Sequence, residues 1–221
     1  MTTPTPGPNE RTKDRLLEAG EHLFARNGIN GVTLREINDR AGQRNSSALH
    51  YHFGTRDNLV LAILKTHQRD VDAAMDAALN DSLIGQGATV RQVLEAVVPG
   101  VAHKLLDPRG CDFLRIIPQI LPELSRTVRA GRIQPTTRTS DRVLALLDHA
   151  LGELPAPIRS ERRVAYVLVL TTTLAERAQA ISENEPVALD HEEFVANLVS
   201  VLAGALTAPA PTLETTTETH A

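Results

Sequence analysis

A run of polar side chains between Val32 and Arg56 has the residue types best suited to contact nucleic acid. The set comprises Thr33, Arg35, Arg44, Asn45, Ser46, Ser47, His50, Tyr51, His52 and Arg56. Arginine, asparagine, serine and tyrosine side chains donate hydrogen bonds to DNA phosphates and to base edges in the grooves. We therefore take these ten residues as candidate contacts to double-stranded DNA.

The same window has a small excess of positive charge. Its arginines outnumber its two carboxylates, Glu36 and Asp39, and give a local charge of about +2 that a dimer would double. The whole chain has a formal net charge of −4, which argues against binding of a polyanion over the entire surface. Contact with DNA is therefore expected to be local and dependent on salt.

Two short helices joined by a glycine turn would carry these side chains. Thr33 and Glu36 have the spacing of a capping box, which predicts that the first helix begins after Thr33. Gly42 stands where a left-handed residue often ends a helix. The second helix is expected to begin near Asn45 or Ser46, since both residues are good N-caps. Because any small helical domain can contain such a pair, the spacing alone leaves a purely structural role open.

Helices on either side favour the DNA-reading interpretation. Upstream, residues 10–27 place an apolar stripe at helical spacing and end in Asn27-Gly28, a stop signal. Downstream, Thr55 is expected to cap a long helix with Leu59 and Ile63 on one side. The predicted order is one covering helix, the helix-turn-helix pair, and a long helix.

These elements resemble the TetR family of one-component transcriptional repressors. The resemblance lies in LLEAGEHLFARNGINGVTLREINDRAG and SALHYHFGTRDNLVLAIL. Two departures stand out: His50 occupies the place of a usual tyrosine, and the stretch between Ala41 and Phe53 is one residue longer than the common pattern. Arg56 replaces the family's usual lysine and keeps a phosphate-binding charge. The resemblance implies a homodimer that binds a palindromic operator and is released by a small-molecule effector.

The fold class that follows is all-α, with an N-terminal three-helix helix-turn-helix domain joined by a long helix to a larger C-terminal ligand-binding and dimerisation domain. We predict a disordered arm at residues 1–9, the DNA-binding domain at 10–54, the effector and dimerisation domain at 55–207, and a disordered tail at 208–221. The arm and tail are rich in Pro and Thr and lack apolar periodicity.

The middle of the chain is expected to be helical and to bind the effector. The run Asp107-Pro108-Arg109-Gly110 predicts a turn, and Pro118 and Pro122 predict that residues 113–124 form short, bent helical pieces. Candidate pocket residues are His67, His103, Phe113, Arg115, Ile116, Gln119, Ile120 and His149. Polar residues of this kind more often lie on the surface, or are hydrogen-bonded within the core, than contact a ligand. Scarce aromatics weakly favour an aliphatic effector.

Two helices near the end of the chain are candidates for the dimer interface. The run VAYVLVL within residues 162–181 is apolar all round, which predicts burial against several neighbours. Asp190 and Glu193 have capping spacing at the start of a last helix with an apolar stripe. The interface candidates are Val164, Val167, Leu168, Thr171, Ala175, Phe194, Leu198, Val201, Leu202 and Ala205. Packing of both helices wholly within one subunit is the alternative.

Other classes of protein find little support in the sequence. No metal-binding, phosphate-binding or Cys-x-x-Cys motif occurs, so we expect no enzyme activity, no metal and no cofactor. Cys111 is the single cysteine, no apolar run is long enough to cross a bilayer, and no secretory signal is visible, so the cytoplasm is expected. A helical adaptor that binds protein through residues 164–170, without DNA, is the remaining alternative.

Overall fold

The computed structural model describes residues 7–43, 45, 47–79, 87–129 and 137–211. Its helices are α1 (Pro8–Asn27), α2 (Leu34–Arg40), α3 (Ala48–Phe53), α4 (Arg56–Ala78), α6 (Val90–Ala102), the 3-10 helix η1 (His103–Leu106), α7 (Pro108–Arg129), α8 (Arg138–Ala150), α9 (Ala156–Ser182) and α10 (His191–Thr207). No strand occurs in these ranges, and the predicted all-α fold is confirmed.

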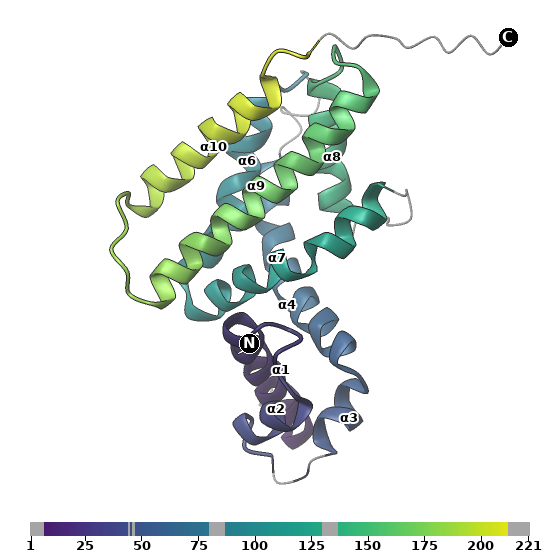
Figure 1. The fold of residues 1–221 in the computed structure, drawn as a ribbon, viewed down its shortest axis with the longest axis vertical. Helices are drawn as coiled ribbons and strands as arrows, with labels where there is room; N and C mark the ends of the chain where they lie inside the picture. Colours follow the sequence, from purple (N-terminus) through teal and green to yellow (C-terminus); the bar gives the residue numbers. More distant parts are fainter. Residues whose placement is uncertain (1–6, 44, 46, 80–86, 130–136, 212–221) are drawn as a thin grey trace, which may run out of the picture.

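The helices form a small N-terminal group and a larger C-terminal group. Figure 1 shows α1, α2 and α3 together at the lower end, with α4 running up from them into the larger group. Helices α6, α8, α9 and α10 lie in the upper part, and α7 crosses between the two groups. Helix α1 begins at Pro8, inside the segment predicted as an arm, and the chain before residue 7 and after residue 211 lies outside the described residues.

The N-terminal group has its own apolar core, and α7 takes part in it. Leu16 and Phe24 of α1, Leu49 of α3 and Leu59 of α4 are fully buried in this core, and so is Ile116 of α7. Burying one such side chain contributes about 1.5–3 kcal/mol. Since α1 also packs more extensively against α7 than against α2 or α4, the two groups are joined through α7 as well as through α4.

The observed helix starts and ends around the helix-turn-helix largely match the predicted ones. The Thr33 hydroxyl accepts the Glu36 N–H at 3.2 Å, and Glu36 Oε2 accepts the Thr33 N–H at 2.7 Å, which confirms the capping box. Gly42 has a φ of 65°, the left-handed conformation expected after α2. Thr55 caps α4 through the Asn58 N–H.

Helix α3 begins later than predicted. Its N-cap is Ser47, and Asn45 instead accepts the Ser47 N–H at its Oδ1, 2.9 Å away. A short polar side chain that binds the backbone two residues on forms a turn rather than a helix cap, which is why the predicted start at 45 or 46 was wrong. Arg44 and Ser46 lie outside the described residues.

Helix α7 contradicts two expectations. The predicted turn at residues 107–110 is the start of the helix, with Pro108 first and Asp107 Oδ1 accepting the Gly110 N–H at 2.9 Å. Proline suits the first helical position because that N–H has no partner within the helix. The helix also continues through Pro118 and Pro122 to Arg129 instead of breaking into short pieces. We attribute this continuity to its extensive packing against α1 and α9, which outweighs the two lost hydrogen bonds.

Candidate nucleic-acid interface

Helix α3 presents a polar face outward and an apolar face to the core. Ala48, Leu49 and Phe53 are buried, whereas Tyr51 is 77% exposed although it is large and partly apolar. Asn45, Ser47 and His50 are also exposed, and His52 is half-buried. The exposed set has hydrogen-bond donors suited to base edges in the major groove, and an aromatic ring that could make apolar contact with a thymine methyl group.

A buried side chain that the sequence analysis missed holds α3 in place. Asn38 of α2 is 2% exposed, and its Oδ1 accepts the Leu49 N–H of α3 at 3.2 Å. Its Nδ2 donates to the Leu34 carbonyl at 3.0 Å, and its own carbonyl accepts the Gln43 N–H at 2.9 Å. The side-chain amide of Asn38 therefore joins the two helices, and its backbone carbonyl holds the turn between them. The available signal was its position beside Ile37, on the inward side of α2.

Besides Asn45, which accepts the Ser47 N–H, three of the ten candidate contacts form bonds that hold the helices and loops of this end in place. Thr33 forms the capping box, and His50 Nδ1 lies 2.8 Å from the Gly54 carbonyl at the end of α3. Arg56 Nη2 donates to the Val32 carbonyl at 2.7 Å, which ties the start of α4 to the loop before α2. These bonds give the three residues a structural role in the arrangement described here.

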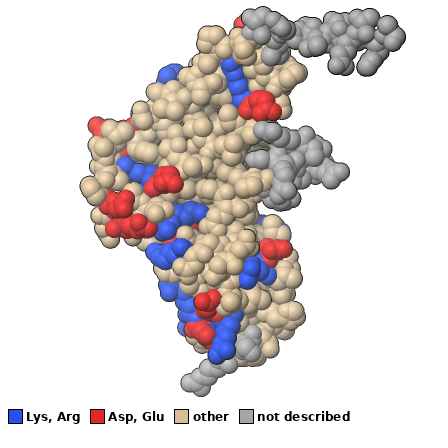
Figure 2. Space-filling view, in the orientation of Figure 1, with Lys and Arg blue, Asp and Glu red and all other residues tan. Residues whose placement is uncertain are grey.

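Charges on this end of the molecule are mixed. Figure 2 shows Lys and Arg side chains interspersed with Asp and Glu over its lower part. Arg35 is exposed and lies 3.8 Å from Asp39 one turn along α2. Hydrogen bonds from the Thr33 N–H and hydroxyl lower the pKa of Glu36, so its carboxylate stays charged at neutral pH. Electrostatic attraction to phosphates is therefore modest.

The eight predicted effector residues are spread over several regions. His67 contacts Glu21 and stacks on Phe113 with ring centroids 4.5 Å apart, while Ile116 and Ile120 belong to the N-terminal core. His103 lies against the Gly100 carbonyl, and Arg115 pairs with Glu183. Gln119 bonds to α1, and His149 is exposed on α8. The structure does not gather these eight residues around one cavity.

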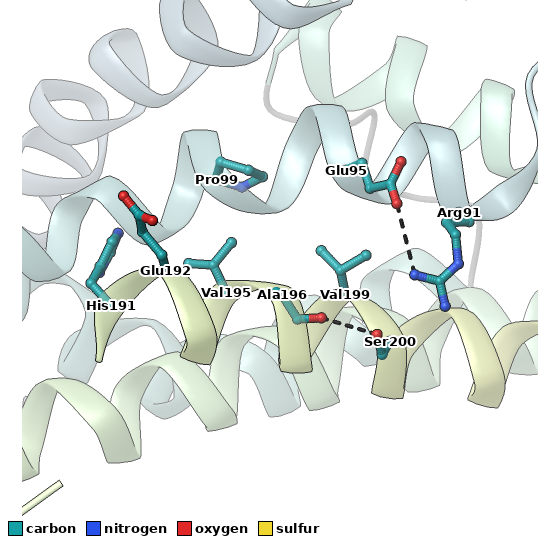
Figure 3. Close-up of a pocket in the computed structure, with 9 residues that line it drawn as sticks. All are labelled: Arg91, Glu95, Pro99, His191, Glu192, Val195, Ala196, Val199 and Ser200. Atoms are coloured by element: carbon teal, nitrogen blue, oxygen red, sulfur yellow. Dashed lines mark hydrogen bonds and ion pairs between the residues drawn. The ribbon is translucent and has the colours of Figure 1, made fainter. Parts of the chain in front are cut away.

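A groove of about 420 Å³ lies between α6 and α10. Figure 3 shows Val195 and Val199 of α10 pointing toward α6, where Pro99 and the Arg91–Glu95 ion pair lie, and Ala196 lies beside them on α10. His191, Glu192 and Ser200 complete the lining. Its volume lies in the range typical of small-molecule sites, and an apolar floor with charged edges suits an amphiphilic ligand. None of the eight predicted effector residues lines it.

The predicted dimer residues divide into a buried set and an exposed set. Val164, Ala175, Phe194, Leu198 and Leu202 are buried within the subunit. Leu168 of α9 and Val201 of α10 are 40% and 49% exposed. Ala205, one turn after Val201 on α10, is exposed as well, while Val167 and Thr171 are half-buried. Within the single chain, the run VAYVLVL is buried on one side and leaves its other side exposed. A second copy of the chain could contact only the exposed set.

Other candidate chemistry is limited. Burial and the nearby Asp107 and Asp112 raise the pKa of the Cys111 thiol, which disfavours the reactive thiolate. Within the described ranges no group of three or more His, Cys, Asp or Glu could hold a metal ion. The same ranges contain no helix with the length and apolar character that crossing a bilayer demands.

Comparison with known proteins shows that the N-terminal part matches a known family of regulators. Residues 16–63 match the family model described as bacterial regulatory proteins, tetR family. The HTH-type transcriptional regulator SrpR of Pseudomonas putida is 23% identical over 176 residues, which cover 79% of this chain and 78% of SrpR. The HTH-type transcriptional regulator QacR of Staphylococcus aureus is 38% identical over 56 residues, or 25% of this chain and 29% of QacR.

Solved structures extend the likeness of the fold to almost the whole chain. A TetR-like transcriptional regulator from Rhodococcus sp. RHA1 is similar with a TM-score of 0.57 and 15% identity, covering 94% of this chain and 100% of that chain. A second transcriptional regulator from Rhodococcus sp. gives a TM-score of 0.52 and 21% identity, covering 88% and 95%. At these identities the likeness concerns the fold alone.

Proposed function

We propose that the chain is a transcriptional regulator of the TetR family, with its DNA-binding domain at residues 16–63, and that it acts as a homodimeric repressor released from a palindromic operator by a small molecule. The proposal places this activity in the cytoplasm, where the DNA is. No catalytic step is required.

The observation that carries the proposal is the outward polar face of α3. Tyr51, Asn45, Ser47 and His50 are exposed on or beside a helix whose opposite face is buried in the N-terminal core. A helix of six residues reads only a few base pairs. Two copies placed about one helical turn of DNA apart, roughly 34–36 Å, would read enough bases for a specific site.

The dimer surface that we propose is the exposed side of α9 and α10. Leu168 and Val201 are large apolar side chains left in contact with water, and Ala205 lies in the next turn of α10 after Val201. A Cβ added at Gly204 would meet no atom within 4 Å, so a partner helix could approach closely there. Covering these residues with the same residues of a second copy gives the twofold symmetry that a palindrome requires.

We further propose the groove between α6 and α10 as the effector site. It adjoins α10, so a ligand there would contact a helix of the proposed dimer surface (Figure 3). Release requires the effector to bind the DNA-bound and free geometries with different affinity, and a coupling of about 1–3 kcal/mol changes operator affinity roughly 5- to 150-fold.

The test is selection of bound sequences from a random duplex library by the purified chain, followed by measurement of affinity for the selected site. We expect a palindromic consensus and a specific affinity that exceeds that for unrelated DNA by about 10³-fold or more at physiological salt. Selection of no consensus, with retention of protein partners instead, would favour the helical adaptor.

A further inference from the structure

A buried carboxylate of α1 is shared between two other helices. Glu21 is 1% exposed, and its Oε1 lies 2.6 Å from His67 Nε2 on α4. Its Oε2 accepts a hydrogen bond from Arg109 Nη2 on α7 at 2.8 Å. An ionised carboxylate is costly to bury unless it is paired and hydrogen-bonded. The three helices are therefore held together at one point.

A second carboxylate reaches in the opposite direction. Asp112 of α7 is 7% exposed, and its Oδ1 accepts a hydrogen bond from Arg26 Nη1 of α1 at 2.8 Å. Its Oδ2 lies 3.2 Å from His22 Nδ1, also on α1. Helix α1 thus places Glu21 against Arg109 of α7, and α7 places Asp112 against Arg26 of α1.

The amide of Gln119 adds a third connection. Its Nε2 donates to the Phe24 carbonyl at 3.0 Å, and its Oε1 accepts the Ile29 N–H at 2.8 Å. These bonds hold the last turn of α1 and the loop after it against α7. We call the whole set the α1–α7 lock; it consists of Glu21, His22, Arg26, His67, Arg109, Asp112 and Gln119.

The lock restricts the position of the N-terminal group relative to α7 more sharply than apolar contacts alone would. Burial of Ile116 in the N-terminal core is nondirectional and tolerates small slides. Hydrogen bonds weaken steeply as distance and angle depart from their optimum, and buried polar groups can fix the register of packed helices. Since α7 also packs extensively against α9, the lock connects the group that carries α3 to the proposed dimer surface.

On the basis of the proposed dimeric function, we propose that Glu21, Arg109 and Asp112 are positioning residues that fix the separation of the two α3 helices. That separation determines which spacing of operator half-sites the dimer accepts. One base pair inserted between half-sites moves them apart by about 3.4 Å and rotates them by about 34°, because B-DNA has about 10–10.5 base pairs per turn. A dimer with a loosened lock would adapt to such a change.

The test compares how strongly operator affinity depends on half-site spacing in variants of the lock and in a matched control. Arg109→Gln and Asp112→Asn, singly and together, remove charges from both carboxylate pairs; Arg109 is half-exposed, which favours folding of its variant. Arg142→Gln is the control, because the ion pair of Arg142 with Asp76 joins α8 to α4 at 3.7 Å, away from α1. The DNA probe is the site selected from the random library, remade with half-sites one or two base pairs closer or farther apart.

We expect the unmodified chain and Arg142→Gln to lose about tenfold or more in affinity for each altered spacing, a cost comparable with that of a mismatched base pair. For each altered spacing, the double variant should lose less than about threefold in operator affinity, while its affinity for a single half-site stays unchanged. A general loss of stability would not produce this combination. Equal spacing discrimination in the double variant and the unmodified chain would overturn the proposal.

A second measurement tests the lock without DNA. Spin labels are attached at Ser47→Cys, the N-cap of α3, and at Ser200→Cys on α10, and the labelled chain is diluted with unlabelled chain. They report the distance between the two groups of helices, and the native Cys111 is buried. We expect a narrow distance distribution in the unmodified chain and Arg142→Gln, and a broad one in the double lock variant. A narrow distribution in all three would refute the lock. Failure of the unmodified chain to select DNA would instead contradict the proposed function.

Discussion

At the scale of single residues, Tyr51 is the most informative side chain of the proposed interface. A tyrosine exposed to 77% on a helix whose other face is fully packed contributes little to the core, so its ring and hydroxyl are available for DNA. Its neighbours on the same surface, Asn45 and Ser47, are shorter and polar. The combination offers one apolar contact and several hydrogen bonds to the floor of a major groove.

Replacing Tyr51 with alanine should weaken specific operator binding by about 1–3 kcal/mol, the usual worth of a base contact, and leave the unfolding temperature nearly unchanged. Titration of a labelled operator measures the affinity. Tyr51→Phe is the matched control, because it keeps the ring and removes the hydroxyl. Unaltered affinity in both variants would mean that α3 reads DNA through other side chains.

His22 should make stability depend on pH. Burial, then the charges of Arg26 and Arg40, lower its pKa, while Asp112 acts to raise it. The folded protein therefore binds fewer protons than the unfolded chain as pH falls below the unfolded value of about 6.5, and its stability declines over that range. Melting temperatures at pH 7.5, 6.5 and 5.5 should fall less in His22→Asn than in the unmodified chain. An equal fall in both would exclude His22 as a cause.

At the scale of elements, α3 depends on α2 for its position. The helix has six residues and no side-chain cap of its own, and one of its first backbone donors, the Leu49 N–H, finds its acceptor in Asn38. Isolated helices of this length are unstable in water. The angle between the two helices is therefore set by a buried hydrogen bond together with the apolar contacts of Leu49 and Phe53.

Asn38→Ala should destabilise the protein by about 1–3 kcal/mol, because it leaves the buried Leu49 N–H without its acceptor. Operator affinity should fall as well, since α3 would lose its fixed orientation. Thr89→Ala serves as the control: loss of the cap of α6, away from the DNA-reading helices, should cost about 1 kcal/mol and leave the bond between α2 and α3 intact. Chemical denaturation and operator titration give the two quantities, and equal operator affinity in the two variants would contradict this role of Asn38.

At the scale of the whole molecule, the proposed function requires two copies held at one separation. The proposed surface on α9 and α10 would join the copies, α7 packs against α9, and the α1–α7 lock connects α7 to the N-terminal core. Figure 1 shows this order from the upper helices to α3 at the lower end. The distance between the reading helices is therefore a property of the entire fold.

The double substitution Leu168→Glu and Val201→Glu should abolish the dimer, because it would bury four unpaired carboxylates in the symmetric interface. Light scattering should give a mass near 24.0 kDa, that of one chain. Operator affinity should fall to that of a single half-site. Leu61→Glu, at an equally exposed apolar residue on α4, is the control and should remain dimeric. A dimeric double variant would place the interface elsewhere.

Local chemistry in the sequence determined the helix-turn-helix. The Thr33–Glu36 capping box, the left-handed Gly42 and the Thr55 cap each act within a few residues, so their pattern alone predicts where helices begin and end. The alternation of buried and exposed residues on α3 follows from the same helical period. These features also carry the resemblance to the TetR family.

Only the tertiary structure decided what depends on residues far apart in the chain. Asn38 acts by facing Leu49, Arg109 by reaching Glu21 eighty-eight residues away, and Ile116 by entering the N-terminal core. Packing on both sides also kept α7 continuous through two prolines that local rules treat as breaks. Burial and pairing energies belong to contacts between helices, and no local pattern specifies which helices meet.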